Sequence, residues 1–187
     1  MISQEPRSEI PREMSLYPHP RRVVTGHDEN GHAVFVADNR VPCLPMAVDC
    51  NFAVLYETHE FPVTNDGWED PILKKTESLA NHTGIVLRCV DFKPNTKTML
   101  HRTESLDFGL VFDGEVVCYL DNGVELTLRA GDTCVQRGTI HGWDNRTDKP
   151  ARIFFILSAA KPVQVGGEIL KATGFDDKDV VSGGQSH

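Results

Sequence analysis

The chain has 187 residues, of which 40% are hydrophobic and 25% are charged, and its formal net charge is −8. These values are ordinary for a soluble protein of one domain with a sizeable core. The negative charge argues against a nucleic-acid or anionic-membrane partner. Because no apolar run approaches the roughly 20 residues of a membrane span and the N-terminus lacks the apolar core of a signal peptide, we expect a cytoplasmic protein.

Residues 1–20 are polar and contain several prolines, which predicts an N-terminal arm. We expect one domain over residues 21–170 and a loose tail over residues 171–187. The first hairpin is predicted from two β-rich runs around Asn30 and Gly31. The five cysteines form no Cys-x-x-Cys pair, so we interpret them mostly as small buried hydrophobic residues in a reducing compartment.

Further strands are predicted over residues 52–58, 84–92 and 151–157, and several more between residues 99 and 137. The strand at 84–92 is apolar on both faces and should be well buried. A tight hairpin turn is expected at residues 121–123, with the sequence Asp-Asn-Gly. Residues 64–84 form the longest irregular stretch, with room for a short helix over 71–80 and a pocket rim. Short, evenly spaced strands with turn residues between them predict an all-β barrel or sandwich.

One stretch, "MLHRTESLDFG" (99–109), carries candidate ligands. Alternation along a strand would place Met99, His101 and Thr103 on one face. With Asp107 and the remote His141, His101 could form a face of two histidines and one carboxylate for a divalent metal. A carboxylate between two imidazoles would keep its charge and raise their basicity.

These stretches resemble the two motifs of the cupin superfamily. The first motif reads H-x-H, three or four residues, E, six residues, G; in this chain Thr103 replaces the second histidine and Asp107 replaces the glutamate. The second motif is matched by Gly131, Gly138, His141 and Asn145, with one residue missing and no proline. The resemblance covers residues 84–158 and implies a small single-domain cupin, a double-stranded β-helix or jelly-roll barrel, with extra N-terminal strands.

The resemblance leaves three interpretations of the site open. His101, Asp107 and His141 would be three ligands of one divalent Fe, Mn, Ni or Zn ion, because three protein ligands still suffice. A metal-free pocket, in which the same residues do acid–base work or bind substrate, is equally arguable. Alternatively, the polar groups only satisfy one another inside the barrel.

Four further residues are candidate substrate contacts: Arg88, Thr103, Trp143 and Phe155. Arg88 would hold a substrate carboxylate or pair with an acid of the protein, because a guanidinium on an apolar strand face needs a partner. Trp143, two residues after His141, would wall the pocket. We expect the other apolar walls to be Val86, Met99 and Val111.

The resemblance implies a small-molecule enzyme. We expect a lyase or isomerase, of decarboxylase or dehydratase type, acting on an oxygenated organic acid or an aromatic or polyketide-like molecule in secondary metabolism. Proton transfer needs only a positioned base and an electrophilic stabiliser. The alternatives are a non-haem metal-dependent dioxygenase and a non-catalytic ligand-binding cupin. A homodimer is expected, because small barrels leave open edges that a partner's N-terminal strands could cover.

Overall fold

A computed structural model describes residues 15–46, 49–73 and 79–174 of the chain. Within these residues, the only helical element is one 3-10 turn, η2 (Pro71–Leu73), and the rest of the regular structure is β-strand. The all-β prediction is therefore confirmed. The helix expected over 71–80 is reduced to η2 in the part that can be described, and residues 74–78 lie outside the described residues.

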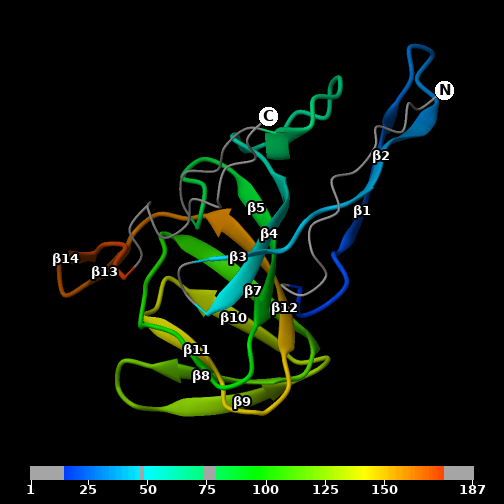
Figure 1. The fold of residues 1–187 in the computed structure, drawn as a ribbon. Coiled ribbons are helices and arrows are strands. Elements are labelled where there is room, and N and C mark those ends of the chain that lie inside the picture. Colours follow the sequence, from blue (N-terminus) through cyan, green and yellow to red (C-terminus); the bar gives the residue numbers. More distant parts are fainter. Residues whose placement is uncertain (1–14, 47–48, 74–78, 175–187) are drawn as a thin grey trace.

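Two antiparallel sheets pack face to face and form the barrel (Figure 1). The larger sheet has six strands in the order β10-β7-β12-β5-β4-β3. Its strands are β3 (Leu44–Pro45), β4 (Cys50–Glu57), β5 (Ile85–Phe92), β7 (Ser105–Asp113), β10 (Thr133–Arg137) and β12 (Ala151–Ala159). The smaller sheet, in the order β6-β11-β8-β9, contains β6 (Thr96–Lys97), β8 (Glu115–Leu120), β9 (Glu125–Arg129) and β11 (His141–Asn145).

The core lies between these sheets because each contributes its apolar inner face. From β5 of the larger sheet, Val90 and Phe92 pack into the same buried cluster as Val116 of β8 and Trp143 of β11. A second buried cluster covers the outer face of the larger sheet and includes Cys89 of β5. Strand β5 therefore buries both faces, as the apolar residues on both of its faces predict.

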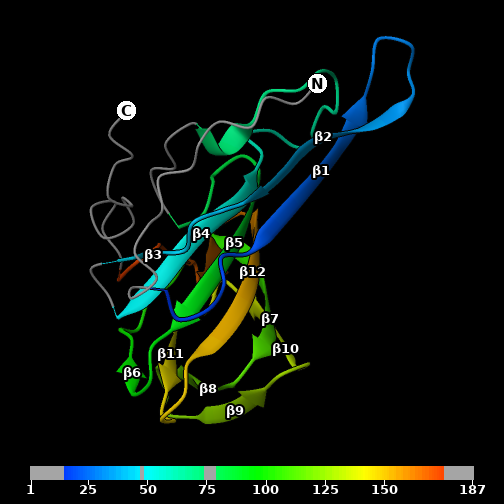
Figure 2. The ribbon, with the colours of Figure 1, turned by 45° about the vertical axis from the view of Figure 1, so that its right-hand side comes forward.

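Two hairpins lie outside the barrel sheets. The first pairs β1 (Arg21–His27) with β2 (Ala33–Arg40) and extends well away from the barrel (Figures 1 and 2). Its turn is held by the Asp28 carboxylate, which accepts hydrogen bonds from the main-chain N–H groups of Asn30 and His32. This confirms the predicted N-terminal hairpin. The second pairs β13 (Val163–Val165) with β14 (Glu168–Leu170).

The described ends of the chain lie on the barrel. In the segment before β1, the Tyr17 hydroxyl shares its one hydrogen between Asp113 and the carbonyl of Pro150, both at 2.8 Å. At the other end, Thr173 exchanges main-chain hydrogen bonds with Arg102. The expected arm and tail boundaries remain predictions, because residues 1–14 and 175–187 lie outside the described residues. In the described part of the chain, no helix is long and apolar enough to cross a membrane.

Candidate functional site

A pocket enters the barrel between the two sheets. It holds about 570 Å³ of free space, part of which is open to solvent. Apolar pockets of this size with a few polar groups are typical of small-molecule sites. The lining residues are Cys50, Phe52, Leu79, Arg88, Val90, Phe92, Thr98, His101, Thr103, Asp107, Gln136, His141, Trp143, Phe155 and Leu157. All seven residues predicted to contact substrate or metal are among them.

His101 and His141, here called the imidazole pair, lie against each other. Their main chains form an antiparallel bridge in which each N–H donates to the other's carbonyl at 2.9 Å. This bridge holds the two rings edge to face, with centroids 4.3 Å apart. Residues 40 positions apart in the sequence are thereby fixed by main-chain geometry at the start of β11.

The imidazole pair is held in one tautomer. Nδ1 of His101 lies 3.2 Å from the carbonyl of Met99, and Nδ1 of His141 lies 2.9 Å from the carbonyl of Thr139. Because a carbonyl only accepts, each Nδ1 carries the hydrogen and each Nε2 keeps a lone pair. The pair therefore offers the pocket two hydrogen-bond acceptors or bases.

Both imidazoles have depressed pKa values. Burial lowers the pKa of His101, and burial together with the positive charge that His101 would carry lowers the pKa of His141 to about 3. Both rings are therefore neutral at neutral pH. The expectation that a carboxylate between them raises their basicity is wrong, because Asp107 makes its hydrogen bonds elsewhere.

The Asp107 carboxylate accepts hydrogen bonds from two hydroxyl groups that are near it in the sequence. Its Oδ1 accepts a hydrogen bond from Ser105 at 2.5 Å, and its Oδ2 accepts one from Thr103 at 2.9 Å. Burial raises the pKa of Asp107, and these two hydroxyl donors oppose that rise. Thr103, at the position of the missing cupin histidine, thus supports the carboxylate.

Of the three expected metal ligands, His101 and His141 lie against each other, whereas Asp107 does not join them in one ligand group. The Nε2 atoms of the imidazole pair suit a metal, since metal-bound histidines usually donate their other N–H to a carbonyl. Asp107 lines the same pocket, but the donor atoms of the three residues do not all lie within 4.8 Å of one another: within residues 15–46, 49–73 and 79–174, only Cys43, Cys89 and Asp91 form such a group. The arrangement fits two metal ligands and does not fit three.

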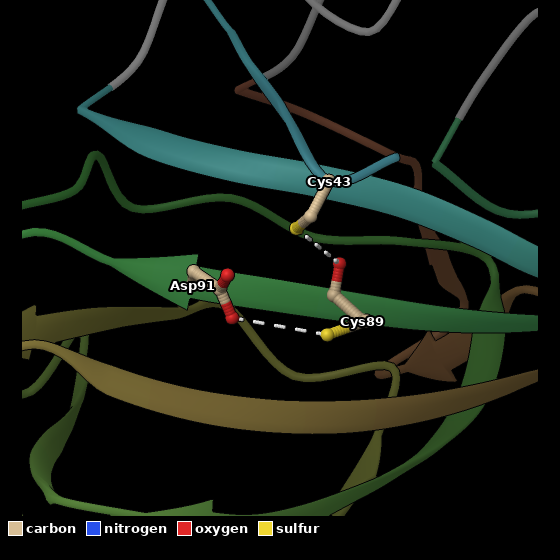
Figure 3. Close-up of side chains that lie close together, drawn as sticks. All are labelled: Cys43, Cys89 and Asp91. Carbon is tan, nitrogen blue, oxygen red and sulfur yellow. Dashed lines mark hydrogen bonds between the residues drawn. The ribbon is translucent and has the colours of Figure 1, made fainter. Parts of the chain in front are cut away.

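Cys43, Cys89 and Asp91 lie close together beside β5 (Figure 3). Because Cys89 and Asp91 alternate along β5 with the pocket-lining Arg88 and Val90, this group lies on the opposite face of the strand from the pocket. Cys43 Sγ contacts the Cys89 carbonyl at 4.0 Å, and Cys89 Sγ contacts Asp91 at 3.8 Å. Hydrogen bonding with Cys89, together with burial, raises the pKa of Cys43 and keeps its thiol protonated. Both oxygens of Asp91 accept hydrogen bonds from Arg152, at 2.6 and 2.7 Å, so the negative charge of the carboxylate is balanced by the guanidinium. We interpret the group as core packing beside a buried ion pair, consistent with the expectation for the cysteines.

Arg88 reaches the pocket from β5 and is almost completely buried. Its Nε donates to the carbonyl of Leu79 at 2.8 Å. Burial lowers its pKa to about 10, and the charge of the buried Glu57 opposes this shift. Arg88 therefore brings a positive charge to the pocket while it also interacts with an acid of the protein.

Aromatic rings form one wall of the pocket. The rings of Trp143 and Phe155 meet edge to face with centroids 5.5 Å apart, and Trp143 also faces the ring of His141. The predicted walls at Val86, Met99 and Val111 are wrong, because none of them lines the pocket. Met99 is 45% exposed, since residues 98–100 form no strand and the alternation assumed from the sequence does not hold there.

Gln136 is a lining residue that the sequence analysis missed. It lies on β10 directly opposite Asp107 on β7. The signal was its place in the alternating strand 133–137, which becomes informative only when the β7–β10 register is known. Leu79 also lines the pocket, in agreement with the expectation that the 64–84 stretch forms part of the rim.

Comparison with known proteins agrees with this fold and these motifs. Residues 88–157 match the cupin domain model. The chain is 36% identical to protein D of the phomopsin biosynthesis cluster of Diaporthe leptostromiformis, over 84% of this chain and 89% of that protein. It is 37% identical to a cupin-domain-containing oxidoreductase of Neurospora crassa, over 81% of this chain and 79% of that protein.

Among solved structures, an uncharacterised protein with a double-stranded β-helix domain from Klebsiella pneumoniae has 18% identity and a TM-score of 0.46, covering 63% of this chain and 84% of that one. The two fungal relatives are similar along most of their lengths, beyond the residues of the cupin motifs. The chain therefore belongs to the cupin family.

Proposed function

We propose that this cupin is an enzyme of secondary metabolism that transfers a proton within an oxygenated small molecule, as a lyase or an isomerase. The observation that carries the proposal is the imidazole pair: two neutral rings, each with its hydrogen on Nδ1 and its basic nitrogen at Nε2, in a pocket with an aromatic wall. The relative from the phomopsin biosynthesis cluster supports a place in secondary metabolism.

The pair acts as one proton-accepting unit. Since a charge on one ring lowers the pKa of the other, the two neutral rings can accept only one additional proton between them during the reaction. Burial makes His141 a weak base when no substrate is bound. A bound substrate that becomes an anion raises its basicity, because the developing negative charge stabilises the imidazolium.

The remaining polar groups stabilise that anion and orient it. Arg88 supplies a buried positive charge close to the apolar wall, where charge interactions are stronger than in water. Asp107, held in one orientation by Thr103 and Ser105, presents a fixed carboxylate that accepts a hydrogen bond from a substrate hydroxyl. Trp143 and Phe155 give a planar, mostly apolar substrate a surface to stack on.

Solvent-deuterium incorporation tests the proposal. The protein is incubated in D₂O with a panel of enolisable ketones and β-keto acids, under nitrogen and with a chelator, and the products are analysed by mass spectrometry. We expect protein-dependent deuterium incorporation or decarboxylation of at least one compound. The reaction should be lost in His141→Gln and retained in His27→Gln, whose histidine is exposed on the β1–β2 hairpin. Equal rates in wild type and His141→Gln would refute the role of the pair.

Oxidation is the second candidate function, because the Neurospora crassa relative is named an oxidoreductase. The Nε2 atoms of the imidazole pair could then hold two positions of a divalent metal in a non-haem dioxygenase. The same panel in air with added Fe(II) separates the two candidates. Turnover that requires both oxygen and iron, and vanishes under nitrogen with the chelator, would favour oxidation.

A further inference from the structure

Gln136 carries a buried amide that the protein leaves unpaired. Its side chain is on β10, is 4% exposed and lines the pocket next to Asp107. Neither its Oε1 nor its Nε2 has a hydrogen-bond partner in the described part of the chain. Buried side-chain amides are normally hydrogen-bonded, because an unpaired buried donor or acceptor loses its hydration without compensation.

The polar groups next to Gln136 make their hydrogen bonds to other partners and not to its amide. Asp107 accepts its hydrogen bonds from Thr103 and Ser105 and none from Gln136. The imidazole pair directs its N–H groups to main-chain carbonyls. The amide is therefore a donor and an acceptor side by side, held at the polar end of the pocket and available to a ligand.

The pairing capacity of the amide restricts the ligand. A carboxylate offers only acceptors and leaves Oε1 unpaired, and a simple ketone or ether does the same. A group with an O–H beside a C=O in one plane pairs with both atoms, since its hydroxyl donates to Oε1 and its carbonyl accepts from Nε2. At neutral pH a carboxylic acid is ionised, so among groups whose donor and acceptor are both oxygen atoms the enolised 1,3-dicarbonyl and related hydroxy-carbonyl compounds keep this pair.

We infer that Gln136 recognises the coplanar hydroxyl and carbonyl of an enolised dicarbonyl or hydroxy-carbonyl substrate. This rests on the proposed function, because it places the substrate in the same pocket and names its chemical class. Gln136 is a binding and specificity-determining residue in this scheme. The aromatic wall of Trp143 and Phe155 receives the apolar remainder of the molecule.

Two probes with the same phenyl body test the inference by calorimetry. The enol of 1-phenylbutane-1,3-dione carries the O–H and C=O together, whereas 4-phenylbutan-2-one has one carbonyl and no hydroxyl. Wild type should bind the dione at least about tenfold more tightly, which is the order expected for two hydrogen bonds. Gln136→Met has a side chain of similar length without the amide, and it should bind the two probes within about threefold of each other.

Two controls separate recognition from folding. The melting temperature of Gln136→Met should stay the same or rise, because an unpaired buried amide is removed. The exposed Gln164 on β13 gives a matched variant, Gln164→Met, which should keep the wild-type preference. Equal affinity of wild type for both probes, no binding of either probe, or an undiminished preference in Gln136→Met would overturn the inference. A preference that depends on Gln136 supports it even when no probe exchanges a proton, a result that would count against the proposed function alone.

Discussion

Lowering the pH from 7 to 5 is expected to destabilise the wild-type protein by about 2 kcal/mol more than the His141→Gln variant. The pKa of His141 is about 3 in the folded protein, against an ordinary value of 6.5. Between these values the unfolded chain binds a proton that the folded chain excludes, so this contribution to stability is present above pH 6.5 and is lost as the pH falls. At pH 5 the difference spans about 1.5 pH units at about 1.36 kcal/mol per unit.

Urea denaturation at pH 7, 6 and 5 measures this effect, with the free energy of unfolding obtained by linear extrapolation. Asp107, whose raised pKa acts in the opposite direction, is present in both proteins and cancels in the difference between them. The His27→Gln variant should follow the wild type, because His27 is exposed. Parallel pH dependence in wild type and His141→Gln would refute the claim that His141 is buried as a neutral ring.

Three further perturbations test the structure around the site. Arg152→Met leaves the fully buried Asp91 without its two donors and should lower the free energy of unfolding by about 3–5 kcal/mol. The double variant Arg152→Met, Asp91→Leu should recover most of this loss in urea denaturation. A double variant no more stable than the single one would contradict the role of the ion pair. Thr103→His should tighten zinc binding measured by calorimetry, because it adds a third imidazole to the pocket at the cupin ligand position, and unchanged affinity would count against that register. We propose that a second copy of the chain covers the projecting β1–β2 hairpin, on which Phe35 is 70% exposed. Sedimentation velocity should then show a wild-type dimer that the Phe35→Glu substitution dissociates. A wild-type monomer at micromolar concentration would exclude this dimer.

Much of the fold could be predicted because its signals are local. Alternating apolar residues and Asn- or Gly-containing turns identify both the β1–β2 and the β8–β9 hairpins, and Gly123 takes the left-handed conformation that its turn requires. The apolar residues on both faces of β5 predict its burial on both faces. The expected position of Met99 on the pocket face is wrong, because alternation predicts a shared face only where the chain is a regular strand and residues 98–100 form none.

The sequence predicts which residues line the pocket, but it does not predict how their side chains hydrogen-bond to one another. Matching two separated motifs brings His101 and His141 into one pocket without any knowledge of the pairing. Asp107 accepts hydrogen bonds from Thr103 and Ser105 and not from an imidazole. This depends on the directions of the side chains at the start of β7, which the sequence does not give. The position of Gln136 depends on the register between β10 and β7, which joins residues 29 positions apart.

The most direct test of the account is a nitrogen-15 NMR titration of the ring nitrogens of the imidazole pair, assigned with the His101→Gln and His141→Gln variants. We expect both rings to be neutral at pH 7, with hydrogen on Nδ1 and none on Nε2, and His141 to stay neutral at pH 5. Binding of an enolised dicarbonyl should shift the Nε2 resonance of at least one ring. A His141 imidazolium formed near pH 6.5, or hydrogen on Nε2 at pH 7, would contradict the proposed base and with it the proton-transfer function.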